Sequence, residues 1–558
     1  MTSHNYASKR ITLLLLLALA VSSTPNTRAE QQPPPREQRT LTQPAPTASV
    51  TPTPVPSPSP SPGPTVSPAA RTASSTKTLE ELQARITEVL RKPELTSAFV
   101  GIKVASLETG RILFEENAGK LLRPASNMKL YTVAAATDRL SPDYRFRTSV
   151  YAAASPDAAG ILHGDLVIYG RGDPTIAARF SNGDYFLRIN ELASRIAAAG
   201  VKRVEGDLVG DETYFIGPQY GSGWVWDDLQ WSYGAEVSAL AINDNALDLS
   251  VKPGSAVGSP AIITTGPPDP LLAIVNRVTT GPKGIKRELT LHRGLNANVL
   301  EVSGAIPLDD QGYTRAVGIS HPALLFVYLL RTSLAQRGVV ITGKSRTVAA
   351  LAYPGATALT NPTSLIEIAS IQSPLFGVIA AQTLKPSQNL YTELILRTLG
   401  KVAPVPSNAT NAPLRSEDAG LEVVKSFLKE AGVEASGLTL TGGSGLSRND
   451  MVTAEATLQL LIYMSRHRYA SAFRQALPIA GVDGTLRNRM KNTAAENNVR
   501  AKTGTLRSAA SLSGYLTTAA GENLAFSIMV NNYPGEVDPL SLCIDPITIL
   551  LASFAGRS

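Results

Sequence analysis

The sequence is poor in the residues from which thiol and metal chemistry are built. Its 558 residues include one cysteine, Cys543, and five histidines, and no HExxH motif occurs. A disulfide within the chain and a cysteine-cluster metal site are therefore excluded, and a histidine-rich metal centre is disfavoured. We predict no metal and no cofactor, and a buried packing role for Cys543.

Charge and long apolar runs are also scarce. Charged residues make up 17% of the chain and the formal net charge is +7, too small an excess to indicate nucleic-acid binding in a chain without zinc-finger, basic-zipper or RNP-type signatures. No apolar run approaches the roughly 20 residues that a membrane span needs. Nucleic acid is therefore excluded as a partner, and we expect attachment to a wall or membrane to be peripheral at most.

The first 77 residues predict export followed by a tether. Lys9 and Arg10 precede the apolar run Ile11–Val21, and small residues follow, the order typical of a secretory signal peptide. We assign residues 1–29 to this signal, with an uncleaved anchor as the alternative. Residues 30–77, rich in Pro, Ser and Thr, predict a disordered linker, either a spacer or a passive tail. We expect the protein to act outside the cytoplasm, as a periplasmic or other extracytoplasmic protein.

The remaining chain, about 480 residues, is long enough for two or three domains. Because histidine is scarce and no GxSxG motif occurs, a serine activated by lysine is a better candidate nucleophile than a Ser-His-Asp triad. The motif SxxK occurs three times, at Ser74–Lys77, Ser126–Lys129 and Ser426–Lys429. One or two matches are expected by chance, so their surroundings must distinguish them.

Only Ser126 has the surroundings of a nucleophile. Met128–Leu140 reads as an Ala-rich buried helix, with Ser126 in its first turn, where a hydroxyl faces the positive end of the helix dipole. Lys129, three residues on, shares its helix face. Ser74 lies in the linker, and Ser426 lies inside an amphipathic helix over Asp418–Ala431. A helix-capping serine with a solvated lysine is the alternative for Ser126.

A lysine base requires a depressed pKa, which burial or a second cation can supply, because the ordinary value is about 10.4. Lys502-Thr503-Gly504 occurs once, in the β-type run Val499–Leu506. Leu512–Ala519 and Asn523–Asn531 follow and predict an antiparallel ribbon. A glycine inside a strand favours close approach of another backbone, such as a bound substrate. A simple strand-end turn is the alternative.

A Ser-x-Asn element would complete the site with a hydroxyl that relays a proton and an amide that orients Lys129. Of three matches, Ser3–Asn5 lies in the signal segment and Ser447–Asn449 in a loop. Ser387-Gln388-Asn389 lies between two apolar helical stretches, Ser373–Thr383 and Leu390–Leu399, where a short loop can project into a cleft. We select Ser387 and Asn389, with Ser447 and Asn449 as the reserve.

In this order, Ser126/Lys129, Ser387/Asn389 and Lys502-Thr503-Gly504 resemble the active site of serine penicillin-recognising enzymes. The first gap, 261 positions from Ser126 to Ser387, resembles the class C low-molecular-mass penicillin-binding proteins, the D-alanyl-D-alanine carboxypeptidase/endopeptidase family. Further stretches look like this family: PASNMKL at 124–130, GDLVIYGRGDPT at 164–175, residues 223–245, GGSGLSR at 442–448 and GVDGTLRNR at 481–489. Gly443 departs from it, because we expect an acidic residue before the SGLSR turn.

The resemblance implies an α+β multidomain fold. Residues 78–144 and 344–558 would form a β-lactamase/transpeptidase-like domain, a helical subdomain on a five-stranded antiparallel sheet. Residues 145–343 would form β-rich domains inserted between the first two active-site motifs, consistent with strand-like Gly164–Tyr169 and Leu247–Val251.

The resemblance also implies a mechanism. Lys129, neutral through burial and through Lys502, would take the proton of Ser126, which attacks the carbonyl between two D-alanines. Backbone N–H groups of Ser126 and Thr505 would hold the oxyanion.

The remaining residues would then handle the rest of the substrate. Ser387 would relay the proton, Asn389 would bind the peptide amide, and Lys502 and Thr503, with Gly504 beside them, would hold the terminal carboxylate. The implied partners are peptidoglycan stem peptides and, as inhibitors, β-lactams. The rival hypotheses are a β-lactamase and a catalytically weak penicillin-binding or wall-binding sensor, the latter resting on Gly443 alone.

Overall fold

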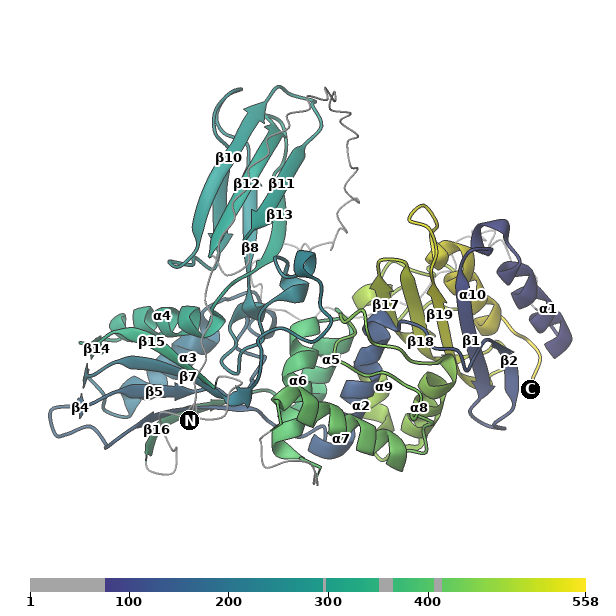
Figure 1. The fold of residues 1–558 in the computed structure, drawn as a ribbon, viewed down its shortest axis with the longest axis horizontal. Helices are drawn as coiled ribbons and strands as arrows, with labels where there is room; N and C mark the ends of the chain where they lie inside the picture. Colours follow the sequence, from purple (N-terminus) through teal and green to yellow (C-terminus); the bar gives the residue numbers. More distant parts are fainter. Residues whose placement is uncertain (1–75, 295–297, 351–364, 406–413) are drawn as a thin grey trace, which may run out of the picture. The chain divides into compact units, whose positions relative to one another are not determined.

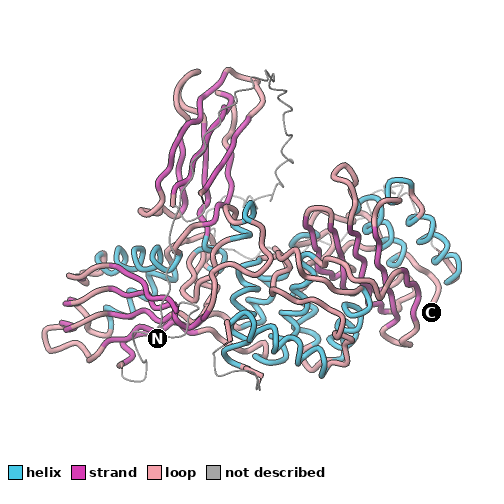
Figure 2. Tube along the Cα trace, viewed as in Figure 1, coloured by secondary structure: helices cyan, strands magenta, loops and turns pink. Residues whose placement is uncertain are grey.

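A computed structural model describes residues 76–558, apart from 295–297, 351–364 and 406–413. The predicted signal peptide and nearly all of the predicted linker lie outside the described residues. The described chain falls within one compact unit, Ala70–Ser558, shown in Figures 1 and 2. No helix of the described ranges combines the length and the apolar character needed to cross a bilayer.

One sheet joins the two ends of the chain. Its order is β17-β18-β19-β1-β2, and every neighbouring pair is antiparallel. The strands are β1 (Phe99–Ser106), β2 (Ile112–Glu116), β17 (Arg500–Leu506), β18 (Ala509–Thr517) and β19 (Asn523–Asn531). The predicted ribbon is its C-terminal part. Strand β17 is an edge strand of this sheet, and at its N-terminal end Ala501 N–H donates to the Pro478 carbonyl at 3.0 Å.

Helices cover both faces of this sheet. Helices α1 (Leu79–Leu90) and α10 (Asp545–Ala552) pack together, and α10 contacts β18, whereas α8 (Ala454–Arg466) contacts β1 and β19. Strands β18 and β19 are accordingly buried over almost their whole length. Cys543 is a free, fully buried thiol in the core under α1 and α10.

A group of helices packs around α2 (Met128–Leu140), which is buried at almost every position. Small alanine side chains let neighbouring helices approach α2 closely. The other members are α5 (Phe376–Leu384), α6 (Asn389–Val402), α7 (Ser416–Glu430) and α9 (Ala470–Ala476). The mixed α+β architecture predicted from the sequence, with five antiparallel strands and helices on the sheet, is confirmed.

A second five-stranded sheet, β15-β7-β5-β3-β16, lies in the chain between the first two motifs. It contains both parallel and antiparallel pairs. Its strands are β3 (Arg147–Ala152), β5 (Leu166–Tyr169), β7 (Leu208–Ile216), β15 (Ser345–Ala350) and β16 (Ile366–Gln372). Helices α3 (Leu187–Ala198) and α4 (Pro322–Ala335) pack against it and against each other, so this β-rich region also contains helices.

Three small sheets complete the inserted region, with the orders β10-β12-β11, β13-β8-β9 and β14-β6-β4. Their strands are β4 (Ile161–His163), β6 (Arg203–Glu205), β8 (Ala246–Lys252), β9 (Ile262–Gly266), β10 (Ala273–Gly281), β11 (Glu288–Arg293), β12 (Val299–Pro307), β13 (Tyr313–Gly318) and β14 (Val340–Ile341). Figure 1 shows the strands β10, β12 and β11 next to β13 and β8.

The strand pairing extends the inserted region beyond the predicted boundary between residues 343 and 344. Strand β15 pairs with β7, and β16 pairs with β3. The chain therefore returns to the helices around α2 only after Gln372. Sheet partners far apart in sequence leave no local signal, which is why the strand pattern alone did not assign these two strands to the insertion.

Candidate active site

Ser126 lies in a short 3₁₀ turn, Ala125–Asn127, that leads directly into α2. It therefore precedes the helix rather than lying in its first α-helical turn. Ala125 adopts a φ of 49°, which turns the chain sharply from the extended segment into the helix. The Ser126 hydroxyl lies 3.0 Å from Lys129 Nζ, and Lys129 itself is fully buried.

The Lys129 amine has two further partners, both uncharged. It donates to Asn389 Oδ1 at 2.5 Å and to the Ser444 carbonyl at 2.7 Å. A neutral amine has two N–H groups and one lone pair. With Asn389 and Ser444 accepting those two hydrogens, the lone pair is left for the hydroxyl proton of Ser126.

Burial lowers the pKa of Lys129 to about 7, against the opposing effect of the carboxylates of Glu393 and Asp450. Burial, helped by repulsion from Lys129, also lowers the pKa of Lys502. The resemblance implied that burial and Lys502 together lower the pKa of Lys129. In the structure burial dominates, and the repulsion between the two lysines lowers the pKa of Lys502.

Ser387 and Asn389 lie where α5 gives way to α6. Ser387 has a φ of 64° in the short connection, and Asn389 is the first residue of α6. Lys502 Nζ donates to Ser387 Oγ at 2.9 Å, while the Asn389 amide donates to the Tyr233 carbonyl at 2.8 Å. The two side chains thus connect to different lysines, Ser387 to Lys502 and Asn389 to Lys129.

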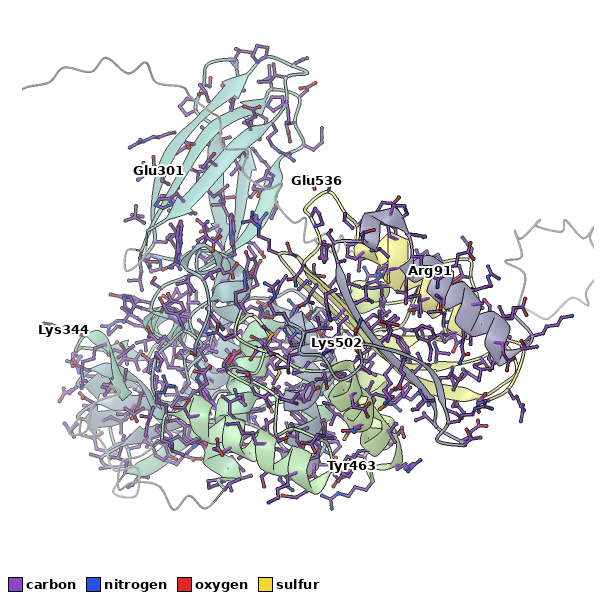
Figure 3. The ribbon with its side chains drawn as sticks, turned by 45° about the vertical axis from the view of Figure 1, so that its right-hand side comes forward. Arg91, Glu301, Lys344, Tyr463, Lys502 and Glu536 are labelled. Carbon is purple, nitrogen blue, oxygen red and sulfur yellow. The ribbon has the colours of Figure 1, made fainter. Side chains whose placement is uncertain are left out.

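The Lys502-Thr503-Gly504 segment runs along edge strand β17, beside Ser126 (Figure 3 labels Lys502). A Cβ atom on Gly504 would lie 3.1 Å from Ser126 N, 2.5 Å from the Pro124 carbonyl and 2.1 Å from Ser511 Oγ. Only glycine allows this approach. Thr503 Oγ1 donates to Thr485 Oγ1 at 2.7 Å, which fixes the orientation of its side chain.

The reserve pair lies apart from the lysines. Ser447 Oγ accepts from Thr441 Oγ1 at 2.7 Å and from the Asn449 backbone at 3.2 Å. Neither Ser447 nor Asn449 hydrogen-bonds to Lys129 or Lys502 within the described chain. The structure therefore brings Ser126, Lys129, Ser387, Asn389 and Lys502 into one cluster and leaves Ser447 and Asn449 in their loop.

Sequence reasoning missed Glu393, a fully buried carboxylate one turn along α6 from Asn389. Its Oε1 accepts from the Ser444 backbone N–H at 3.0 Å, and the Ser444 carbonyl in turn accepts from Lys129. Glu393 thus holds Ser444, whose carbonyl positions the amine. The available signal was its spacing, because residues four apart share a helix face.

Gly443, where an acidic residue was expected, lies close to helix α6. A Cβ at position 443 would lie 3.1 Å from Leu396 Cβ and 3.2 Å from the Thr392 carbonyl, so any side chain there would be tightly packed against α6. The carboxylate beside the SGLSR turn comes from α6 instead of from the turn itself.

Two more buried carboxylates, Glu417 and Asp450, lie near Glu393. Arg397 lies 3.3 Å from Glu393 Oε2 and 3.9 Å from Glu417 Oε2. Burial and the nearby Glu393 raise the pKa of Glu417 against the opposing effects of Arg397 and Arg415. Burial likewise raises the pKa of Asp450 to about 7, although Thr441 donates two hydrogen bonds to Asp450 Oδ1.

The inserted region also reaches the site. Tyr233 accepts from Asn389 through its carbonyl and packs beside Ala125 and Leu446. Arg448 of the SGLSR turn pairs with Asp228 at 2.9 Å. Tyr233 and Asp228 both lie in the stretch 223–245, which resembles the family in sequence. The described chain contains no cluster of His, Cys, Asp or Glu side chains suited to a metal ion.

A Ser–Lys pair, a second serine beside a second lysine, and a glycine-bearing edge strand on this fold define the class of penicillin-recognising peptidases. The chain belongs to the D-Ala-D-Ala carboxypeptidase 3 (S13) family, whose model matches residues 82–550. The resemblance stated from the motifs is thereby confirmed, and the protein is a D-Ala-D-Ala carboxypeptidase of the low-molecular-mass penicillin-binding group.

Individual relatives agree with this assignment. A D-alanyl-D-alanine carboxypeptidase of Actinomadura sp. (strain R39) is 35% identical over 503 residues, 88% of each chain. The D-alanyl-D-alanine carboxypeptidase DacB of Haemophilus influenzae is 25% identical over 78% of this chain and 85% of its own. The crystal structure of penicillin binding protein 4 (dacB) from H. influenzae superposes with a TM-score of 0.70 at 23% identity, covering 84% of this chain and 99% of that one.

Proposed function

We propose that the protein is a serine-type DD-peptidase that acts through an acyl-enzyme on Ser126. The observation that carries this proposal is the placement of a buried amine with a pKa of about 7 at 3.0 Å from the Ser126 hydroxyl. An amine with such a pKa is partly unprotonated at neutral pH and can accept a proton. A general base of this kind contributes roughly 10²–10⁴ in rate.

The first half-reaction transfers the acyl group to the enzyme. Lys129 Nζ takes the proton of Ser126 as Oγ attacks the carbonyl carbon between two D-alanine residues. Backbone N–H groups of Ser126 and Thr505 hold the resulting oxyanion. The carbon–nitrogen bond then breaks, and the departing amine receives the proton from Lys129 by way of the Ser387 hydroxyl.

The groups around Lys502 bind the leaving side of the substrate. Lys502 and Thr503 hold the terminal carboxylate, whose charge favours protonation of Lys502 once substrate is bound. Asn389 orients both Lys129 and the substrate amide. In the second half-reaction a water molecule attacks the ester carbonyl, Lys129 accepts a proton from that water, and Ser126 regains its hydrogen.

The proposal extends to cell-wall substrates and inhibitors. Stem peptides of peptidoglycan ending in D-Ala-D-Ala are the carboxypeptidase substrates, and cross-links between D-Ala and meso-diaminopimelate are endopeptidase substrates. β-Lactams acylate Ser126 because they present a similar amide. The signal-like start of the sequence supports export to an extracytoplasmic space.

Intact-protein mass spectrometry tests this function. The wild-type protein and Ser126→Ala are each incubated with benzylpenicillin and then, separately, with a peptide ending in D-Ala-D-Ala. We expect one benzylpenicillin adduct and D-alanine release for wild type, and neither for the variant. An adduct without D-alanine release would favour the endopeptidase or sensor hypothesis. Absence of the adduct would remove Ser126 as the nucleophile.

A further inference from the structure

Arg293, the last residue of β11, is a buried cation in the inserted region. Its guanidinium donates to Ser320 Oγ at 2.6 Å and to the Leu229 carbonyl at 2.7 Å, and its backbone N–H donates to Gln230 Oε1 at 3.3 Å. Within the described ranges Arg293 forms no ion pair. Burying a charge without a counter-charge is costly, and an apolar side chain of similar volume is often at least as stable. The contacts of Arg293 therefore point to a role beyond packing.

The backbone that Arg293 contacts leads directly to Asp228. Leu229 and Gln230 follow Asp228 in the chain. Strand β13 holds the same segment from a second side, because Gly318 N–H donates to the Gln230 carbonyl at 3.0 Å. Strands β11 and β13 thus fix the short backbone segment that carries the Asp228 carboxylate.

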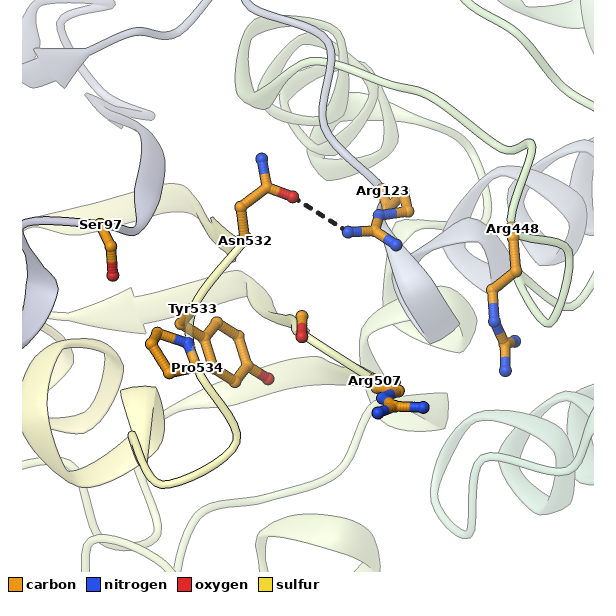
Figure 4. A pocket seen from close by; sticks show the side chains of 8 residues that line it. Ser97, Arg123, Arg448, Arg507, Asn532, Tyr533 and Pro534 are labelled. Atoms are coloured by element: carbon orange, nitrogen blue, oxygen red, sulfur yellow. Dashed lines mark hydrogen bonds between the residues drawn. The ribbon is translucent and has the colours of Figure 1, made fainter. Parts of the chain in front are cut away.

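Asp228 connects this segment to the SGLSR turn, residues 444–448. Asp228 Oδ2 accepts from Arg448 Nη2 at 2.9 Å, and Arg448 Nη1 donates to the Leu446 carbonyl of the same turn at 2.7 Å. Figure 4 shows the side chain of Arg448 extending from this turn. Because Asp228 and Leu446 are buried, water competes little for these contacts. The guanidinium of Arg448 therefore holds the turn in one conformation while Asp228 stays in place.

The turn in turn supports the catalytic amine. The Ser444 carbonyl accepts from Lys129 Nζ at 2.7 Å, so a displaced turn would move this acceptor and admit water beside the amine. Burial is the main cause of the lowered pKa of Lys129, and entry of water would therefore raise that pKa. The charged groups that face the amine, Glu393, Asp450 and Lys502, lie outside this chain of contacts.

We propose that Arg293, in the inserted region, positions the turn that supports Lys129. The connection runs through the Leu229 backbone and the Asp228–Arg448 ion pair. Arg293 is a positioning residue, because it acts through these groups and touches none of the reacting atoms. The inference rests on the proposed function, which makes Lys129 the base, and it gives the inserted β-sheets a part in acylation.

The pH dependence of benzylpenicillin acylation tests this role. In Arg293→Gln we expect the plateau rate to fall by about tenfold, because the base is less well placed. The midpoint of the profile should rise by about half a pH unit as water reaches the amine. A merely structural loss of folded protein would lower the rate at every pH and leave the midpoint in place. An unchanged midpoint would therefore overturn the proposal, whatever the rate.

Arg277→Gln is the matched control, because Arg277 is an exposed arginine of the same small sheet, on β10, paired with Glu301. It should keep both the rate and the midpoint of wild type. The double variant Arg293→Gln/Arg448→Gln tests the route. If the two arginines act in series, its acylation rate should equal that of the slower single variant. Multiplied effects of the two substitutions would show that they act independently and would overturn the proposed connection.

Hydrogen exchange separates this inference from the proposed function, because it needs no turnover. In Arg293→Gln the backbone amides of residues 444–448 should exchange at least about fivefold faster than in wild type, while Arg277→Gln leaves them unchanged. If wild type formed no benzylpenicillin adduct, the proposed function would fail, and faster exchange would still support the positioning of the turn. Equal exchange in Arg293→Gln and wild type would refute it.

A milder variant covers the case in which Arg293→Gln does not fold. Ser320→Ala withdraws one acceptor from the buried guanidinium and leaves its charge in place. It should raise the midpoint and speed the exchange of residues 444–448 in the same directions, by smaller amounts. A Ser320→Ala protein that matched wild type in both measurements would overturn the proposal.

Discussion

The basic side chains of the candidate active site and those of the inserted region have opposite surroundings. In the site, Lys129 and Lys502 are fully buried, and their hydrogen-bond partners are hydroxyl, amide and backbone oxygens. In the inserted region, Arg346 of β15 bridges the carboxylates of Asp165 and Asp207 at 2.6 and 2.7 Å, and all three side chains are at least 30% exposed.

This difference in burial and partners explains which of the two regions can supply a catalytic base. A buried amine with neutral partners is not compensated for its lost hydration, so its pKa is lowered. An exposed guanidinium between two carboxylates keeps its charge, and the pKa of Arg346 is raised. The first arrangement creates a base near neutral pH, whereas the second contributes modest local stability. Changes in the two regions should therefore differ in kind as well as in size.

The largest effect should follow loss of the amine itself. Lys129→Met keeps the length and apolar body of the side chain but removes the proton acceptor, so we expect kcat/KM for D-alanine release and the rate of β-lactam acylation to fall by about 10³. Stopped-flow or quenched acylation assays would measure this. Lys425→Met, on the exposed face of α7, is the control. A Lys129→Met protein with near-normal acylation would rule out lysine as the base.

The next largest effect should follow a methyl group on the edge strand. In Gly504→Ala the added Cβ meets Ser511 Oγ, the Pro124 carbonyl and Ser126 N, all within 3.1 Å. Overpacking of this kind costs about 1–3 kcal/mol, and relief requires β17 to move away from Ser126. We expect a lower melting temperature and an acylation rate reduced by at least about tenfold. The control is Gly119→Ala, because a Cβ added at Gly119 meets open space. Gly521 would be a poor control, because its backbone φ is positive.

Much of the fold could be predicted from the sequence, because the buried helices and strands around the site have distinctive local sequence patterns. The helix Met128–Leu140 and the strand Asn523–Asn531 have the predicted bounds, since continuous apolar runs between turn signals specify such elements. The residues gathered around Ser126 were likewise named from motif and order. What could not be predicted is non-local: the pairing of β15 and β16, and the carboxylate that Glu393 brings to Ser444 from another helix.

The pH dependence of kcat/KM should follow the protonation state of Lys129. Because the amine must be unprotonated to act, kcat/KM should rise with pH through about 7 and then level off, following the lowered pKa of Lys129. The unfolded lysine stays protonated up to about 10.4. Between these values the unfolded state binds more protons, so the contribution of Lys129 to stability grows as pH rises. A rate that rose only near pH 10 would contradict the role of Lys129.

Glu393→Gln should move that profile. The Glu393 carboxylate raises the pKa of Lys129, so its removal should shift the midpoint to lower pH, while the amide oxygen still accepts from Ser444. A lower maximum rate, several-fold at most, reflects the altered contact with Arg397. Glu417→Gln, which changes a carboxylate without an effect on the Lys129 pKa, is the control. An unchanged midpoint in Glu393→Gln would limit Glu393 to a purely structural role.

The smallest effect should come from the inserted region. Arg346→Gln removes both exposed ion pairs with Asp165 and Asp207, and water replaces the lost contacts, so we expect the melting temperature to fall by less than about 2 °C. Calorimetry in low and high salt would measure the difference, which should shrink as salt screens the pairs. The acylation rate should not change. A loss of acylation in Arg346→Gln would show that the ion pairs of the inserted sheet affect the active site. The distinction between a catalytic site and a region whose ion pairs contribute only local stability would then be wrong.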